Sequence, residues 1–139
     1  MADALQATLK IGASGLEAQS NRLRIVSENL ANAQSTAATA GGDPYTRKIV
    51  SFEAEFDEAL SANLVRAGRI DQPRPVYRVE HDPSHPAADA SGYVKLPNVD
   101  ILVELTDMRE ANRSYEANLQ VIKQAREMIA LTIDLLRNA

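Results

Sequence analysis

The stretch "MREANRSYEANLQVIKQAREMIALTIDLL", residues 108–136, carries an apolar or aromatic side chain at every seventh position. A companion row follows the first at a spacing of four residues. A seven-residue apolar repeat is typical of a helix that packs against other helices. The pattern predicts a long amphipathic helix over roughly residues 99–137. The first row is Met108, Tyr115, Ile122, Ile129 and Leu136, and the companion row is Leu105, Leu119 and Ile133.

The apolar side of this predicted helix is wide, because Val121, Met128 and Leu135 extend it beyond the two rows. One partner helix covers only a narrow seam, so a helix this broadly apolar needs several neighbours. Asn98 or Asp100 is expected to cap the start of the helix.

The N-terminal part of the chain shows the same repeat over roughly residues 3–33. Leu9, Leu16, Leu23 and Leu30 follow one another at intervals of seven, and Val26 falls on the adjoining row. This spacing predicts a second long helix.

A further apolar row lies on the opposite side of this N-terminal helix. Ile11, Ala18 and Ile25 each come two residues after a leucine, and two residues turn an α-helix by about 200°. Apolar rows on both sides indicate neighbours on both sides. Gly12 and Gly15 each cost about 1 kcal/mol relative to alanine in a helix interior, so the isolated helix is expected to be weak.

The middle of the chain has a different pattern. "AQSTAATAGGDP", residues 33–44, is small, polar and glycine-containing, which is typical of a flexible loop. "KIVSFEAEF", residues 48–56, alternates apolar and polar side chains as a half-buried strand does. "PVYRVEH", residues 75–81, and "GYVKL", residues 92–96, predict two further short strands.

These segments predict a mainly α fold. Two long terminal helices pair as a coiled-coil-like hairpin, and a small β-containing domain lies between them in the sequence. The expected division is an N-terminal helix in residues 1–35, a loop and small β-rich domain in residues 36–98, and a C-terminal helix in residues 99–139.

Composition excludes several classes of function. The 139 residues carry 15 basic and 19 acidic side chains and a net charge of −4, which gives no positive footprint for nucleic acid. The sequence has no cysteine, so disulfides, thiolate zinc sites and a cysteine nucleophile are excluded. No apolar run approaches the length of a membrane span, and the N-terminus lacks the features of a cleaved signal peptide. We expect no cofactor and no membrane insertion.

The two histidines are the main candidates for a metal site. His81 and His85 have the four-residue spacing that places two imidazoles on one helix face for zinc. Pro83 and Pro86 exclude a helix there, so a shaped or solvent-facing loop is the favoured interpretation. A metal-dependent enzyme that uses both histidines stays open as an alternative.

Two helices that pair would each leave an apolar face uncovered, and a soluble monomer seldom tolerates such a surface. The residues therefore favour a self-assembling or co-assembling structural subunit. The alternative is a soluble coiled-coil adaptor that binds one partner and does not polymerise.

Three separated motifs resemble the bacterial flagellar rod and hook proteins. "SGLEAQSNRLRIVSENLANAQS", residues 14–35, is similar to the family's N-terminal signature, whose S-x-N-[IL]-A-N falls on Ser27, Asn29, Leu30, Ala31 and Asn32. "SYEANLQVIKQAREM", residues 114–128, resembles the C-terminal segment. "DPSHPAADASGYVKLPNVD", residues 82–100, is similar to the members that form the proximal rod.

This resemblance implies a structural subunit of the tubular rod in the flagellar basal body. Family members are exported by the flagellar type III apparatus without a cleaved signal, and they assemble in the periplasm through their terminal helices. The implied partners are copies of the chain, other rod proteins and the MS-ring and export-gate region. The expected assembly-interface residues are Leu9, Leu16, Leu23, Val26, Asn29, Leu30, Asn32, Met108, Tyr115, Asn118, Leu119, Ile122, Ile129, Ile133 and Leu136.

Overall fold

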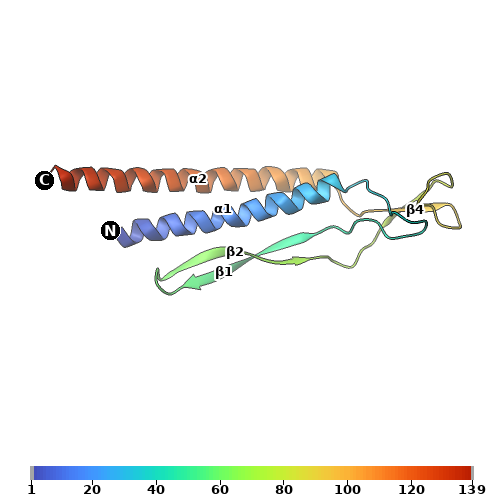
Figure 1. Ribbon diagram of the computed structural model, residues 1–139, viewed down its shortest axis with the longest axis horizontal. Helices are drawn as coiled ribbons and strands as arrows, with labels where there is room; N and C mark the ends of the chain where they lie inside the picture. The colour runs from blue at the N-terminus through green and yellow to red at the C-terminus, as the bar shows by residue number, and fades with distance from the viewer. Residues whose placement is uncertain (1, 139) are drawn as a thin grey trace. The chain divides into compact units, whose positions relative to one another are not determined.

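A computed structural model describes residues 2–138 and shows two long helices with four strands between them in the sequence (Figure 1). The helices are α1 (Ala2–Ala31) and α2 (Ile101–Arg137), and the strands are β1 (Ile49–Asp57), β2 (Ala62–Asp71), β3 (Arg78–His81) and β4 (Tyr93–Leu96). Both predicted helices are confirmed, with ends within two residues of the expected ones. Their pairing as a coiled coil stays a prediction.

Asp100 caps the start of α2, one of the two residues expected to do so. Its Oδ1 accepts hydrogen bonds from the amides of Leu102 at 2.9 Å and Val103 at 3.3 Å. These bonds satisfy two donors that the first turn of a helix leaves free.

Three of the four strands match the predicted ones, and one was not expected. β1 follows the alternating stretch, whereas β3 takes only the second half of residues 75–81. The strand β2 pairs with β1 and was missed, because "ANLVRAGRID" does not alternate cleanly. β3 and β4 form a separate antiparallel pair in which Arg78 lies opposite Leu96 and His81 opposite Tyr93.

The described residues form two compact units, and each unit contains part of both helices. Unit 1 consists of residues 2–23, 51–68 and 109–138, and unit 2 is Arg24–Val50 and Arg69–Met108. The three-part division expected from the sequence follows the elements along the chain, and as a statement about domains it stays a prediction.

In unit 1, α1 and α2 run antiparallel, with small residues where they meet (Figure 1). A Cβ atom on Gly12 would lie 2.9 Å from Cγ1 of Ile122, and one on Gly15 would lie 2.8 Å from the Asn118 amide. On α2, Ala111 and Ala125 are fully buried. The glycines therefore let the helix backbones approach closely, a role that the sequence analysis did not assign to them.

The second apolar side of α1 lies against the β1–β2 hairpin of the same unit (Figure 1). Ser14 Oγ accepts a hydrogen bond from the amide of Val65 at 3.1 Å, and Lys10 pairs with Asp57 at 3.5 Å. Ala18, on the predicted second row, is 1% exposed. One of the neighbours that the two-sided pattern required is therefore supplied by the chain itself.

Unit 2 has a core of a different kind. Ile25 and Val26 of α1 are buried there together with Val94 and Val99. Two polar side chains, Asn29 and Glu104, are buried in the same unit. Within the described residues no helix is long and apolar enough to cross a membrane.

Candidate assembly surface

The side of α2 that does not contact α1 in unit 1 carries a row of exposed apolar residues. Val121, Met128 and Leu135 follow one another at intervals of seven, and Leu131 lies between the last two. We call these four residues the apolar stripe. Leu131 is 64% exposed and Leu135 is 72% exposed. Such a contiguous apolar surface marks a site of protein association more often than an ordinary surface.

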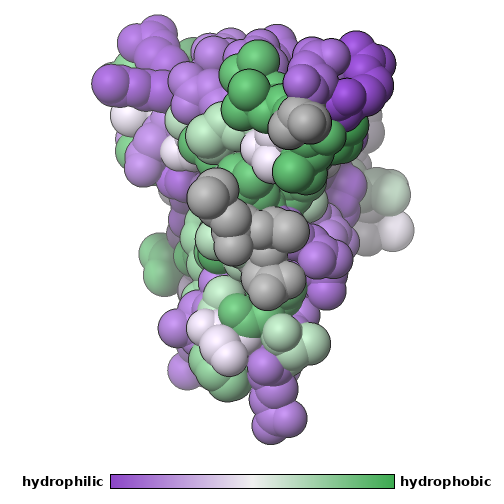
Figure 2. Space-filling view, turned by 90° about the vertical axis from the view of Figure 1, so that its left-hand side faces the viewer, coloured by the Kyte–Doolittle hydropathy of each residue, from purple (hydrophilic) through white to green (hydrophobic). Residues whose placement is uncertain are grey.

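A second exposed apolar region lies where the ends of the two helices meet in unit 1. Leu5 and Leu9 of α1 and Ile129 and Leu136 of α2 line a groove of about 340 Å³. Hydrophobic residues gather over the end of α2 in Figure 2, between hydrophilic ones. The groove brings four of the expected interface residues together, namely Leu9, Ile129, Ile133 and Leu136.

The expected interface residues divide between the two units and differ in exposure. Leu16 and Leu23 of α1 are half-buried, and so are Tyr115, Asn118 and Ile122 of α2. The contact with α1 falls on the side of α2 with Ala111, Asn118 and Ala125, and the row with Leu119 and Ile133 is exposed. In unit 2, Leu30, Asn32 and Met108 are half-buried and Val26 is buried. The role of all these residues in assembly stays a prediction.

Asn29 differs from the other expected interface residues, because all of its side-chain hydrogen bonds are made within the chain. Its Nδ2 donates to the carbonyl of Lys48 at 2.8 Å and to Oε2 of Glu104 at 3.1 Å. Its Oδ1 accepts from the amide of Lys48 at 2.9 Å and from the hydroxyl of Tyr45 at 2.7 Å. An asparagine amide has two donors and two acceptor positions, so all of its capacity is used.

Glu104 connects this cluster to α2. Its carboxylate is 0% exposed, and Oε1 accepts a hydrogen bond from Nε of Arg47 at 2.6 Å. Glu104 and Arg47 were not predicted as site residues, because they lie 57 positions apart and follow no common pattern. We call Asn29, Tyr45, Arg47, Lys48 and Glu104 the polar clasp.

Charges balance around the clasp. Lys48 Nζ pairs with Oε1 of Glu28, and Arg47 pairs with Glu104. Burial, followed by the charges of Glu28 and Glu104, raises the pKa of Tyr45 from 10.0 to about 12. The phenol therefore stays protonated at neutral pH and donates to Asn29.

The histidine-containing segment of residues 81–93, which we call the connector, is held by short-range hydrogen bonds. Asp82 Oδ1 accepts from the amide and hydroxyl of Ser84, and these bonds lower the pKa of Asp82. Asp89 Oδ1 accepts from the amides of Tyr93 and Ser91, which lowers the pKa of Asp89. These contacts agree with a connector that holds a shape.

The histidines have structural contacts in this connector. His85 Nδ1 accepts from the amide of Ala87 at 3.0 Å, and the rings of His81 and Tyr93 lie edge to face with centroids 4.9 Å apart. Among residues 4–138, whose side chains the structure describes, no three acidic or histidine side chains are grouped so that they could hold a metal ion.

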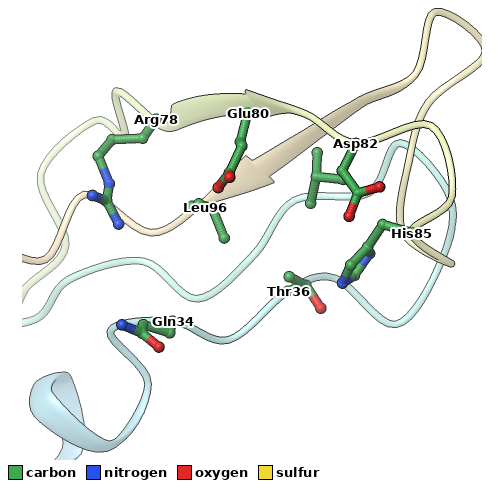
Figure 3. A pocket seen from close by; sticks show the side chains of 8 residues that line it. Gln34, Thr36, Arg78, Glu80, Asp82, His85 and Leu96 are labelled. Carbon is green, nitrogen blue, oxygen red and sulfur yellow. The ribbon is translucent and has the colours of Figure 1, made fainter.

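The same unit has an open polar pocket of about 450 Å³. In Figure 3, Arg78, Glu80 and Asp82 lie on one side of it, and Gln34 and Thr36 lie on the other. Its charges are of both signs, and the arrangement does not select one ligand chemistry.

Two family models match separate parts of the chain. Residues 9–37 match "Flagella basal body rod protein", and residues 90–135 match "Flagellar basal body rod FlgEFG protein C-terminal". The chain is 56% identical over 135 residues to the flagellar basal-body rod protein FlgC of Agrobacterium fabrum, covering 97% of each chain.

More distant relatives carry the same name. FlgC of Salmonella typhimurium is 36% identical over 125 residues, which is 90% of this chain and 92% of the relative. FlgC of Bacillus subtilis is 34% identical over 143 aligned positions, covering 92% and 95%. The chain belongs to the FlgC family of flagellar basal-body rod proteins.

Membership of this family confirms the resemblance seen at three places in the sequence. It also decides between the alternatives left open there. FlgC proteins are structural rod subunits of the basal body that assemble with other rod proteins, so neither an enzyme nor a free adaptor is the appropriate description.

Proposed function

We propose that this rod protein assembles into the proximal rod through its terminal helices, with the apolar stripe of α2 as a contact to neighbouring subunits. The observation that supports this most is that unit 1 buries small apolar residues and exposes large ones, the reverse of an ordinary hydrophobic core. The fully buried apolar side chains among its described residues are alanines (Ala18, Ala111 and Ala125), whereas the apolar stripe is exposed.

This reversal has an energetic consequence. Full burial of a leucine or methionine side chain contributes about 1.5–3 kcal/mol relative to leaving it in water. Met128 is 48% exposed and Leu131 and Leu135 more so, so the chain by itself gains only part of that contribution. Neighbouring helices in a tubular wall would supply the missing burial.

The partners we propose are copies of this chain, other rod proteins and the MS-ring and export-gate region at the base of the rod. The proposed location is the periplasmic part of the basal body, reached through the flagellar type III apparatus without a cleaved signal. A narrow export channel requires unfolded subunits, and contacts that form only between subunits are compatible with that route.

The test places a charge on the apolar stripe. Met128→Asp and Leu135→Asp each introduce an acid at a position that is exposed in the single chain, so folding of the purified chain should change little. Burial of that charge in an assembly costs several kcal/mol. Rod formation, followed by electron microscopy of basal bodies, should be lost.

Gln120→Asp is the matched control, because it adds the same charge at an exposed polar position of α2. Rods should form normally with this variant. Secretion of all three variants into the periplasm separates an export defect from an assembly defect. Normal rods with Leu135→Asp would contradict the assignment of the stripe as a contact surface.

A further inference from the structure

We infer that the polar clasp is the positioning element of unit 2. It joins the C-terminal end of α1, the segment of residues 45–48 and the start of α2 in one arrangement. Asn29 would then act inside the chain, through the geometry it imposes, and would not touch a neighbouring subunit. This inference concerns folding of the single chain and does not rest on the proposed contact surface.

The Asn29 side chain makes two hydrogen bonds to the backbone of a single residue of the segment. Its amide donates to the carbonyl of Lys48 and accepts from the amide of the same residue. A strand neighbour would make the same pair of bonds, so the side chain replaces a strand partner for this segment. Asparagine supplies both the donor and the acceptor that the backbone of Lys48 requires.

Glu104 is buried within unit 2. An ionised carboxylate that is 0% exposed is stable only when it is paired and hydrogen-bonded. Arg47 and Asn29 each occupy one of its oxygens, from two different segments of the chain. Displacement of either segment would leave a buried charge without its partner.

The apolar pattern repeats every seven residues in both helices. Heptad rows alone allow a helix pair to slip by one repeat, because each apolar residue is replaced by the next. The clasp has no second copy seven residues along, because Thr36 follows Asn29 at that distance and Ala111 follows Glu104. A buried polar contact of this kind selects one register.

The test replaces the Asn29 amide with a carboxylate and the Glu104 carboxylate with an amide, singly and together. Asn29→Asp would place a second carboxylate about 3 Å from Glu104 and remove the donor to Lys48. Glu104→Gln alone would place an amide donor against the Asn29 donor. In the double variant, the glutamine introduced at position 104 could accept from Arg47 through its Oε1. Its Nε2 could donate to the aspartate introduced at position 29. Each single variant should raise the unfolding equilibrium constant roughly 10- to 100-fold, and the double variant should recover part of that loss.

The pH dependence of Asn29→Asp gives an independent readout. The groups around the site carry two positive charges, on Arg47 and Lys48, and two negative charges, on Glu28 and Glu104. The neutral hydroxyl of Tyr45 also faces it. A third carboxylate makes this region net negative. The pKa of the carboxyl group introduced at position 29 is therefore raised above the ordinary range of a carboxyl group. The destabilisation is then full at high pH and decreases as pH falls toward about 4.

Asn32→Asp is the control on the same turn of α1. Asn32 Nδ2 donates only to the carbonyl of Glu28 among the contacts described, at 2.9 Å, and is half-buried. Urea unfolding of the purified variants at about pH 5.5 and pH 8 measures the outcome. The inference is supported if Glu104→Gln partly restores Asn29→Asp and does not restore Asn32→Asp. Strictly additive losses, or equal pH dependence of the two aspartate variants, would overturn it.

Discussion

Replacement of Gly15 by alanine separates two explanations of the glycines in α1. If Gly15 only weakens the helix, Gly15→Ala should stabilise the chain by about 1 kcal/mol, the difference in helix propensity. If it permits close approach, the new Cβ meets the Asn118 side chain, with Nδ2 and Oδ1 both at 2.8 Å and Cγ at 2.9 Å. Ordinary contacts of a Cβ atom begin near 3.4 Å.

The magnitude follows from these distances. Asn118 must move by more than half an ångström, and its Nδ2 donates to the carbonyl of Ser114 at 3.0 Å. Overpacking of this kind costs about 1–3 kcal/mol. It offsets the propensity gain of about 1 kcal/mol, so we expect Gly15→Ala to be neutral or destabilising by up to about 2 kcal/mol.

Asn118→Ala provides the matched background. It removes the amide that the new Cβ would meet, so Gly15→Ala should stabilise this variant by about 1 kcal/mol. The coupling energy between the two sites should be about 1–3 kcal/mol, measured by urea unfolding in a double-mutant cycle. Ala13→Gly, at an exposed position of the same helix, calibrates the propensity alone. Stabilisation by Gly15→Ala in the original background, with no coupling to Asn118, would refute the close-approach explanation.

Three further predictions concern the connector and α1. His85→Ala should destabilise unit 2 by about 1 kcal/mol and His85→Asn by less, because Asn can still accept from the amide of Ala87; thermal unfolding compares the two. The pKa values of Asp82 and Asp89 lie below the ordinary 3.8, so the stability that these carboxylates contribute is present above pH 3.8 and is lost as the pH falls through their lower folded values. The unfolding midpoint, measured as a function of acid pH for the original chain and for Asp82→Asn, checks the sign. Leu23→Asp should abolish swimming while export continues, since an unpaired charge would be buried in the rod at a cost of several kcal/mol; a motile strain would contradict the role given to the leucine row.

The elements of the fold were largely predictable, because they depend on local patterns. The heptad rows predicted both helices, and alternation over residues 48–56 predicted β1. Periodicity identifies which residues are apolar, but it does not identify what covers them. The row with Ala18 predicted a neighbour on that side of the helix without identifying it, and the neighbour is the hairpin of the same chain, whose second strand β2 carried no clear alternation.

The polar clasp was beyond the reach of these patterns for a different reason. Asn29 and Glu104 are separated by 75 positions, and each has an ordinary local interpretation. Glu104 suits the first turn of a helix through the helix dipole, which explains its presence without any partner. Only the packing of unit 2 brings it to Arg47, because long-range polar contacts depend on tertiary geometry and leave no period in the sequence.

The two units therefore resolve the same problem, how to hold two heptad helices together, with opposite chemistry. Unit 1 uses glycine and alanine at the contact, next to Ile122, which brings the backbones close, and the apolar stripe of α2 remains exposed. Unit 2 uses a saturated amide and a buried ion pair, whose geometry has few alternatives. If the stripe contacts neighbouring subunits, as proposed above, it cannot also fix the contacts within the chain. Directional contacts within the chain leave the non-directional apolar surface available for assembly.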